Sequence, residues 1–377
     1  MKFLHIADLH IGKIVNGFSM LEDQEYILNE IINITDEEEP DAVLIAGDVY
    51  DKTTPSAAAV SLFDEFLYDL TQRNVHVFII SGNHDSPERL SFGGRIMEKS
   101  NVHISPVYNG KSMCITLEDE YGPVNIYMLP FIKPKDVRAF FPDARTESYT
   151  DAARCAVDEM DVDAGKRNIL IAHQFVTGAQ TFKSEELSIG GLDNVDGDVF
   201  GCFDYAALGH IHGPQSVGSE KIRYAGTPLK YSFSECSHKK SASVIELKEK
   251  GNLKIRTRPL TPLRDMAEIR GTYEEVTLRD FYKDTSFKDA YLHITLTDEE
   301  DVPEALGRLR AIYPNLMRLD YDNSRTRGSE SLKETDVTED DMNPLEIFRR
   351  IYESRNNAEI TDEQEMFLNE LIEKIWV

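Results

Sequence analysis

The side chains best suited to bind metal ions or move protons in this chain follow directly after short apolar runs. The run Phe78-Ile79-Ile80 gives way, after Ser81, to a glycine, Asn83, His84 and Asp85. Similar apolar runs precede four other polar groups: Asp8 and His10, Asp48 and Asp51, His173, and His210 and His212. Amide, imidazole and carboxylate groups are poor packing groups but good ligands and proton carriers, so their positions indicate chemistry.

The spacing within these groups suits the binding of a shared ion. Asp8 and His10 are two residues apart, as are His210 and His212. In an extended segment, side chains two apart point to the same side, so each pair can offer two ligands to one ion. A glycine comes just before three of the groups, at Gly47, Gly82 and Gly209. We expect the chain to turn sharply there and let an ion approach the backbone.

The ligand types indicate two divalent ions. Carboxylate, amide oxygen and imidazole without thiolate suit Mn, Fe, Zn or Mg. There are more ligands than one tetrahedral site needs, and paired ions ~3.5–4 Å apart can hold both the attacking and the leaving oxygen of a phosphoryl displacement. Taken alone, each motif is more typical of an ordinary turn or a core histidine. Together they place five of the chain's ten histidines at strand ends, which favours a metal site.

The elements that carry these groups predict an α/β fold. Helical stripes with a 3.6-residue period, such as Ile27, Leu28, Ile31 and Ile32, lie between the apolar runs. Strands that alternate with helices indicate an α/β domain, and ligands of such domains gather beyond the carboxyl ends of the strands. Every polar group above lies at such an end, so we expect the groups to converge.

Composition limits the class of protein. The 377 residues are 41% hydrophobic, which suits a folded chain of two or three domains. No apolar run approaches the ~20 residues that span a bilayer, so we expect no membrane contact. Four widely spaced cysteines suit a reducing cytoplasm. The formal charge of −26 is unusual for a nucleic-acid-binding protein, so a phosphate-bearing substrate must be held by metal ions, a local patch or a partner.

The pattern changes near residue 262. We interpret residues 1–262 as the chemical domain and 263–333 as a small α+β domain that caps it. Residues 334–341 contain five carboxylates and predict a solvated linker. Residues 342–377 predict two amphipathic helices, which either pack on this protein's own core or, as we prefer, bind a partner.

The complete series resembles the signature of the calcineurin-like metallophosphoesterases. The stretches "SGNHDSPERL", "LPFIKP", "ALGHIH" and "YAGTPLKYSFSE" further resemble the SbcD-type nucleases of double-strand-break repair. This resemblance implies a two-sheet β-sandwich flanked by helices, with a small α+β domain and a C-terminal helix pair. It also implies two ions of the manganese type and a Mn-dependent nuclease that cuts DNA ends, hairpins or breaks. The implied setting is a cytoplasmic, nucleoid-associated homodimer within a heterotetramer with an SMC-like, coiled-coil ATPase subunit, active in DNA repair and recombination.

The resemblance also assigns roles to residues. Asp8, His10, Asp48 and His212 would bind one ion, and Asp48, Asn83, His173 and His210 would bind the other. His84 would donate a proton to the leaving oxygen or stabilise the charged phosphorane, and the carboxylate of Asp51 would orient the His84 ring. Arg89 and Lys133 are candidate phosphate contacts, with an ordinary surface cation as an equal alternative.

Two alternatives remain open. The same metal ions could serve a phosphodiesterase for small molecules or cyclic nucleotides, or a phosphoprotein phosphatase, and the acidic charge favours this class. A non-catalytic scaffold would be expected to lack ligands, yet none is missing here.

Overall fold

The computed structural model describes residues 1–181, 193–324, 326, 360, 364–365 and 367–368. The predicted acidic linker 334–341 and almost all of the predicted helix pair 342–377 lie outside these residues. The chain divides into two compact units. The first comprises residues 1–268, 286–293 and 315–318, and the second comprises residues 269–285, 294–314 and 319–377.

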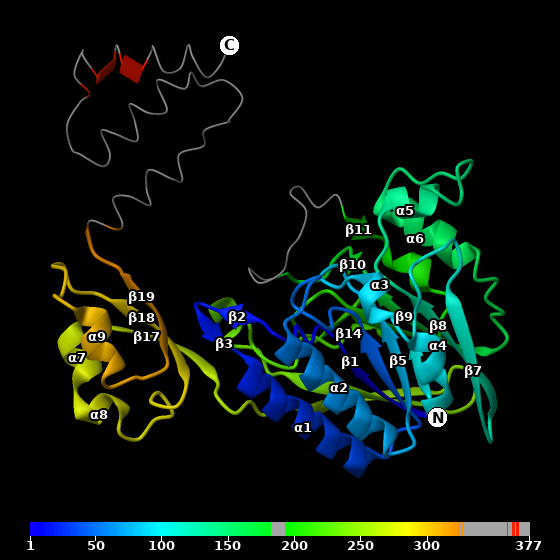
Figure 1. The fold of residues 1–377 in the computed structure, drawn as a ribbon, viewed down its shortest axis with the longest axis horizontal. Coiled ribbons are helices and arrows are strands. Elements are labelled where there is room, and N and C mark those ends of the chain that lie inside the picture. The colour runs from blue at the N-terminus through cyan, green and yellow to red at the C-terminus, as the bar shows by residue number, and fades with distance from the viewer. Residues whose placement is uncertain (182–192, 325, 327–359, 361–363, 366, 369–377) are drawn as a thin grey trace. The chain divides into compact units, whose positions relative to one another are not determined.

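Two six-stranded sheets form the body of the first unit (Figure 1). The first sheet has the order β16 (Leu253–Pro259), β15 (Ser241–Leu247), β1 (Lys2–Ile6), β4 (Ala42–Ala46), β5 (His76–Ile80) and β6 (Val102–Ile104). The second has the order β13 (Gln215–Val217), β14 (Ser219–Tyr224), β12 (Tyr205–Gly209), β9 (Arg167–His173), β8 (Gly122–Leu129) and β7 (Met113–Asp119). β1, β4 and β5 are parallel neighbours, as are β9 and β12, so their carboxyl ends lie at one edge of each sheet.

Helices connect these strands. They are α1 (Leu21–Glu38), α2 (Ala57–Thr71), α3 (Pro87–Leu90), α4 (Gly94–Met97), α5 (Pro134–Arg138) and α6 (Tyr149–Asp158). Short pieces complete the unit: strands β2 (Ile14–Val15), β3 (Phe18–Ser19), β10 (Phe175–Val176) and β11 (Asn194–Val195), and 3₁₀ turns at Glu98–Ser100, Gly197–Phe200 and Phe233–Glu235. None of the helices that the structure describes combines the length and apolarity needed to cross a bilayer.

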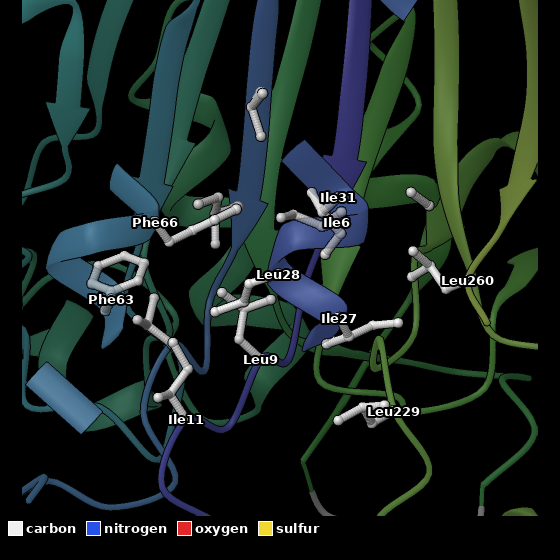
Figure 2. Packing of buried hydrophobic residues seen from close by; sticks show 14 of the residues in the cluster. Ile6, Leu9, Ile11, Ile27, Leu28, Ile31, Phe63, Phe66, Leu229 and Leu260 are labelled. Carbon is white, nitrogen blue, oxygen red and sulfur yellow. The ribbon is translucent and has the colours of Figure 1, made fainter. Parts of the chain in front are cut away.

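The apolar residues form three layers of core. Along β4, Val43 and Ile45 belong to a cluster with the buried faces of α1 and α2, whereas Leu44 belongs to a cluster between the two sheets. This alternation follows from the two-residue period of a strand. The predicted stripe of α1 packs there with residues of β1 and the segment after it (Figure 2). A third cluster joins the second sheet to α6. The predicted two-sheet sandwich flanked by helices is confirmed.

A smaller sheet follows residue 262. Its three strands have the order β17 (Met266–Gly271), β18 (Tyr291–Leu296) and β19 (Leu316–Tyr321). Its helices are α7 (Tyr273–Thr277), α8 (Arg279–Tyr282) and α9 (Ala305–Arg310). The strands expected from "YLHITL" and "LMRLDYDN" and a helix between them are present. The domain boundaries at 262, 333 and 341 stay predictions.

Candidate metal centre

Five strands from both sheets bring the candidate ligands together. Asp8 and His10 follow β1, Asp48 follows β4, and Asn83 follows β5. In the second sheet, His173 is the last residue of β9, and His210 and His212 follow β12. Main-chain bonds hold these strand ends together, since Asp8 N donates to the carbonyl of Gly47 at 3.0 Å and His10 N donates to that of Asp48 at 2.9 Å.

The backbone around the ligands is strained. Asp8, His10 and Asp48 have φ values of 53°, 46° and 48°, and His210 has a φ of 100°. Such left-handed conformations cost of order 1–3 kcal/mol each for residues other than glycine and cluster at functional sites. Our expectation that Asp8 and His10 share a side because their segment is extended was therefore wrong. The two side chains converge because the chain turns at each of them.

Glycines make room for the ligands at two positions. A Cβ atom on Gly82 would lie 2.1 Å from Oδ1 of Asp48. A Cβ atom on Gly209 would lie 1.9 Å from the carbonyl oxygen of Ala46 and 2.7 Å from Nδ1 of His173. No side chain fits at these distances, so the glycines predicted before the ligands allow close approach between the ends of neighbouring strands.

One group of donor atoms surrounds Asn83. Its Oδ1 lies 3.0 Å from Nε2 of His173 and 2.9 Å from Nδ1 of His210. Oδ2 of Asp48 lies 3.4 Å from the same nitrogen of His173. Nδ1 of His173 is 2.8 Å from the carbonyl of Ala46, which can only accept, so Nδ1 donates and Nε2 faces the other donors. These four residues are the predicted second ligand set.

A second group lies on the other side of Asp48. Nε2 of His10 is 3.3 Å from Nε2 of His212 and 3.7 Å from Oδ2 of Asp48. Asp8 is fully buried, and its Oδ1 accepts from the main-chain nitrogen of His210 at 2.8 Å. Asp48 therefore adjoins both groups, as expected of a bridging carboxylate.

The buried charges favour a cation here. Burial alone would lower the pKa of His173, but the charges of Asp48 and Asp8 raise it to about 9. Burial lowers the pKa of His210 to about 3, helped by the charge of His173. Burial also lowers the pKa values of His10 and His212. The centre thus holds neutral imidazoles, with lone pairs available, beside carboxylates that need positive charge.

The residues present fit a pair of divalent ions. Two sets of atoms from His, Asp or Glu lie within 4.8 Å of one another: His10, Asp48 and His84, and Asp8, Asp48 and His173. Two nitrogens bound to one ion at ~2.1 Å lie roughly 3–3.4 Å apart, close to the 3.3 Å between His10 and His212. The donors are oxygen and imidazole nitrogen, which suit Mn, Mg, Fe or Zn.

His84 lies beside the centre, but Asp51 orients it differently from our prediction. Nδ1 of His84 is 3.0 Å from the main-chain oxygen of Asp51, and its main-chain nitrogen donates to Asp48 at 2.9 Å. The carboxylate of Asp51 instead binds Nζ of Lys13 at 2.6 Å. The carboxylate–imidazole pair is therefore wrong as we drew it, because the Asp51 side chain is directed to a cation and only its carbonyl reaches the ring.

The two candidate phosphate contacts flank the centre without touching it. Arg89 donates to the carbonyl of Thr53 at 2.8 Å and to the hydroxyl of Thr54 at 2.6 Å. Lys133 is exposed, with Nζ 5.8 Å from the centroid of the Phe131 ring. Asp85, expected to be structural, accepts bonds from the main-chain nitrogens of Val49, Tyr50 and Gly82 and so holds two ligand loops together.

Sequence reasoning missed several residues around the ligands. The ring of Phe131 stacks on His210 at 6.2 Å between centroids, and that of Phe175 lies 6.4 Å from His210. Behind His212, Oε1 of Glu235 lies 3.5 Å from its Nδ1. Glu235 belongs to the quoted stretch "YAGTPLKYSFSE", but a single acid among 67 carries no spacing signal of its own.

Comparisons with known proteins agree with this geometry. Residues 1–214 match the family described as Calcineurin-like phosphoesterase. Residues 262–356 match the SbcD_C family, described as Type 5 capsule protein repressor C-terminal domain. Among solved structures, a dimetal phosphatase from Danio rerio aligns with a TM-score of 0.41 at 11% identity, over 69% of this chain and 96% of that one. A Thermus thermophilus protein aligns with a TM-score of 0.39 at 11% identity, over 69% of this chain and 99% of that one. Neither likeness is strong enough to support an argument.

A curated relative gives the decisive comparison. The D subunit of the nuclease SbcCD from Staphylococcus epidermidis is 35% identical over 345 residues, which cover 89% of this chain and 90% of the relative. With both family matches and this coverage, the chain belongs to the SbcD nuclease family of the calcineurin-like phosphoesterases.

Proposed function

We propose that this chain hydrolyses DNA phosphodiesters with two Mn²⁺ ions and acts as the nuclease subunit of an SbcCD-type complex. One observation carries the proposal: donor atoms from five strands in two sheets converge on a single carboxylate, Asp48, in a member of the SbcD family. A phosphodiesterase needs this arrangement, because one bridging ligand fixes two ions at a short separation.

The chain's own residues divide the work of holding the ions. Asp8, His10, Asp48 and His212 would hold one ion. The other would be held by Asp48, Asn83, His173 and His210. When bound, the ions supply Lewis-acid polarisation of a phosphoryl group and neutralise the charge that develops on it. Because these ligands are almost entirely buried, their positions are fixed before substrate arrives.

His84 is proposed to act on the leaving group. The contact of its Nδ1 with the carbonyl of Asp51 fixes the ring and its tautomer, since that oxygen can only accept a hydrogen bond. Nε2 therefore faces the centre, 4.0 Å from Oδ2 of Asp48. A proton on Nε2 can pass to the leaving oxygen or stabilise the negative charge of the transition state.

DNA contact requires local cations, since the chain carries a net charge of −26. Lys133 and Arg89 are proposed to contact phosphates because they lie on segments that adjoin ligands: Lys133 beside Phe131, and Arg89 five residues after His84. The remaining attraction would come from the metal ions and from a basic surface of the partner.

A substrate comparison tests this function against its rival. The acidic charge favours a small phosphodiester, whereas family membership favours DNA. We expect Mn²⁺-supplemented protein to cleave end-labelled and hairpin DNA with a far higher kcat/KM than bis(p-nitrophenyl) phosphate, and an Asp48→Asn variant to cleave neither. Turnover of the small diester alone would reject the nuclease function.

The C-terminal region is proposed to bind the partner. Residues 263–333 would form a capping domain that contacts DNA, and 334–341 would be a linker. Residues 342–377 would dock on an SMC-like ATPase subunit, and the relative's name places that protein in a two-component SbcCD assembly. Deletion of residues 342–377 should abolish co-purification with the ATPase and spare Mn²⁺-dependent cleavage. Retained association would refute the docking proposal. A homodimer acting at the nucleoid remains part of the same proposal, and light scattering of the purified chain would test the dimer.

A further inference from the structure

We propose that Glu235, held by Lys240, is a positioning residue that fixes the imidazole of His212 for metal binding. This inference rests on the proposed function, because it concerns the same centre. It assigns a role to a buried ion pair that the direct ligands leave unexplained.

Glu235 faces the side of His212 that is turned away from the other ligands. Its Oε1 lies 3.5 Å from Nδ1 of His212, whereas Nε2 of that ring lies 3.3 Å from Nε2 of His10. A carboxylate accepts hydrogen bonds, so it favours the tautomer with a proton on Nδ1 and the lone pair on Nε2. Carboxylates placed in this way orient metal-binding histidines and make them stronger ligands.

Lys240 holds the carboxylate in place. Its Nζ donates to Oε2 of Glu235 at 2.5 Å, to the hydroxyl of Thr227 at 2.6 Å and to the main-chain oxygen of His212 at 3.0 Å. One ammonium group thus fixes both the carboxylate and the backbone of the histidine. The side chain of His238 also approaches, with Nδ1 4.0 Å from Oε2 of Glu235.

The burial of this pair argues for a purpose beyond stability. Glu235 is 0% exposed and Lys240 is 5% exposed. Burying two charges costs desolvation energy that their attraction often fails to exceed, so an apolar pair of similar size would serve the core as well. An ion pair that reaches a candidate ligand on both its side chain and its main chain is explained by positioning that ligand.

The test measures Mn²⁺ binding directly. In Glu235→Met/Lys240→Met, both charges are removed together, so neither partner is left as an unpaired buried charge. We expect this variant to fold and to bind one of two Mn²⁺ ions about 10–100-fold more weakly, with the other ion unchanged. Titration of the metal-free protein with Mn²⁺, followed by the EPR signal of the free ion, gives both dissociation constants. Unchanged dissociation constants for both ions would overturn the inference.

A matched control separates positioning from general loss of an ion pair. Glu38, whose side chain is 7% exposed, pairs with Arg256 and Arg258, which are not among the candidate ligands. Glu38→Met should bind both ions like the wild type, and an equal loss of Mn²⁺ affinity in this variant would overturn the inference. If the double variant does not fold, Glu235→Gln decides the matter. This variant keeps the shape of the side chain and loses its charge, so it should weaken the same single ion, and unchanged binding would overturn the proposal.

The outcome is distinguishable from failure of the proposed function. If the wild type binds two Mn²⁺ ions and the variants lose one, the positioning role holds even when no DNA cleavage is seen. That result would reject only the nuclease function. A wild type that binds no Mn²⁺ would overturn both.

Discussion

His84 offers the sharpest test of how the centre divides binding from chemistry. His84 lies near His10 and Asp48, so it could be a metal ligand. We assign it to proton transfer because its Nε2 is 4.0 Å from Oδ2 of Asp48, whereas that of His173 is 3.4 Å from the same oxygen. His84→Ala should therefore leave both ions bound and remove the proton donor.

The expected loss of activity follows from the role. A positioned general acid contributes ~10²–10⁴-fold, so kcat should fall by that factor. This corresponds to about 2.7–5.5 kcal/mol of transition-state stabilisation at ~1.36 kcal/mol per tenfold change. KM should change little, because a group that acts mainly in the transition state contributes equally to kcat and kcat/KM.

The assay combines steady-state cleavage of end-labelled DNA with a count of bound Mn²⁺ by elemental analysis. His76→Ala is a suitable control, since His76 begins the same strand, β5, and pairs with His103 at 3.2 Å. It should retain both kcat and metal. Loss of one Mn²⁺ from His84→Ala would show that His84 is a ligand, and an unchanged kcat would show that it has no catalytic role.

Three further predictions concern the surrounding residues. Asp51→Asn keeps the main-chain oxygen that contacts His84, so kcat should fall less than ~10-fold; a loss of ~10²-fold or more would restore the carboxylate role. Gly209→Ala should destabilise the protein by at least ~1–3 kcal/mol in denaturant unfolding, because its Cβ would overlap the carbonyl of Ala46, whereas Gly307→Ala in α9 meets no atom within 4 Å and should be neutral or stabilising. Mn²⁺ binding should strengthen as pH rises towards about 9, because His173, with its raised pKa, must release a proton to bind the ion. Calorimetry in buffers of different ionisation enthalpy should show about one proton released at pH 7, and no release would contradict the assignment.

The same pKa shift fixes the sign of a stability effect in the metal-free protein. His173 has a folded pKa of about 9, above its ordinary value of 6.5. Its contribution is therefore fully present below pH 6.5 and is lost as pH rises through 9. Added Mn²⁺ should remove this dependence, because the ion replaces the proton.

The sequence allowed much of the centre to be predicted because strand ends are easy to recognise. An apolar run such as "AVLIA" can only be a buried strand here, and parallel strands bring their carboxyl ends to one edge. All seven candidate ligands were found in this way. The facing of the two sheets, which brings His173 to Ala46, came only from the family resemblance, because period-two alternation does not say what covers each face.

Two features escaped because they depend on backbone geometry and distant contacts. The left-handed φ values of Asp8 and His10 have no signal in residue type, since aspartate and histidine adopt them only when the surrounding structure requires it. The direction of the Asp51 side chain depended on Lys13, which lies 38 residues away in sequence. Glu235 approaches His212 in the same manner, after a turn that sequence spacing does not define.

The proposed centre depends most on the convergence of both ligand sets on Asp48. Anomalous diffraction at the manganese edge, from crystals soaked in Mn²⁺, tests this directly. We predict two peaks ~3.5–4 Å apart on either side of Asp48, one beside His10 and His212 and the other beside Asn83, His173 and His210. A single peak, or no peak at saturating Mn²⁺, would contradict the dinuclear centre.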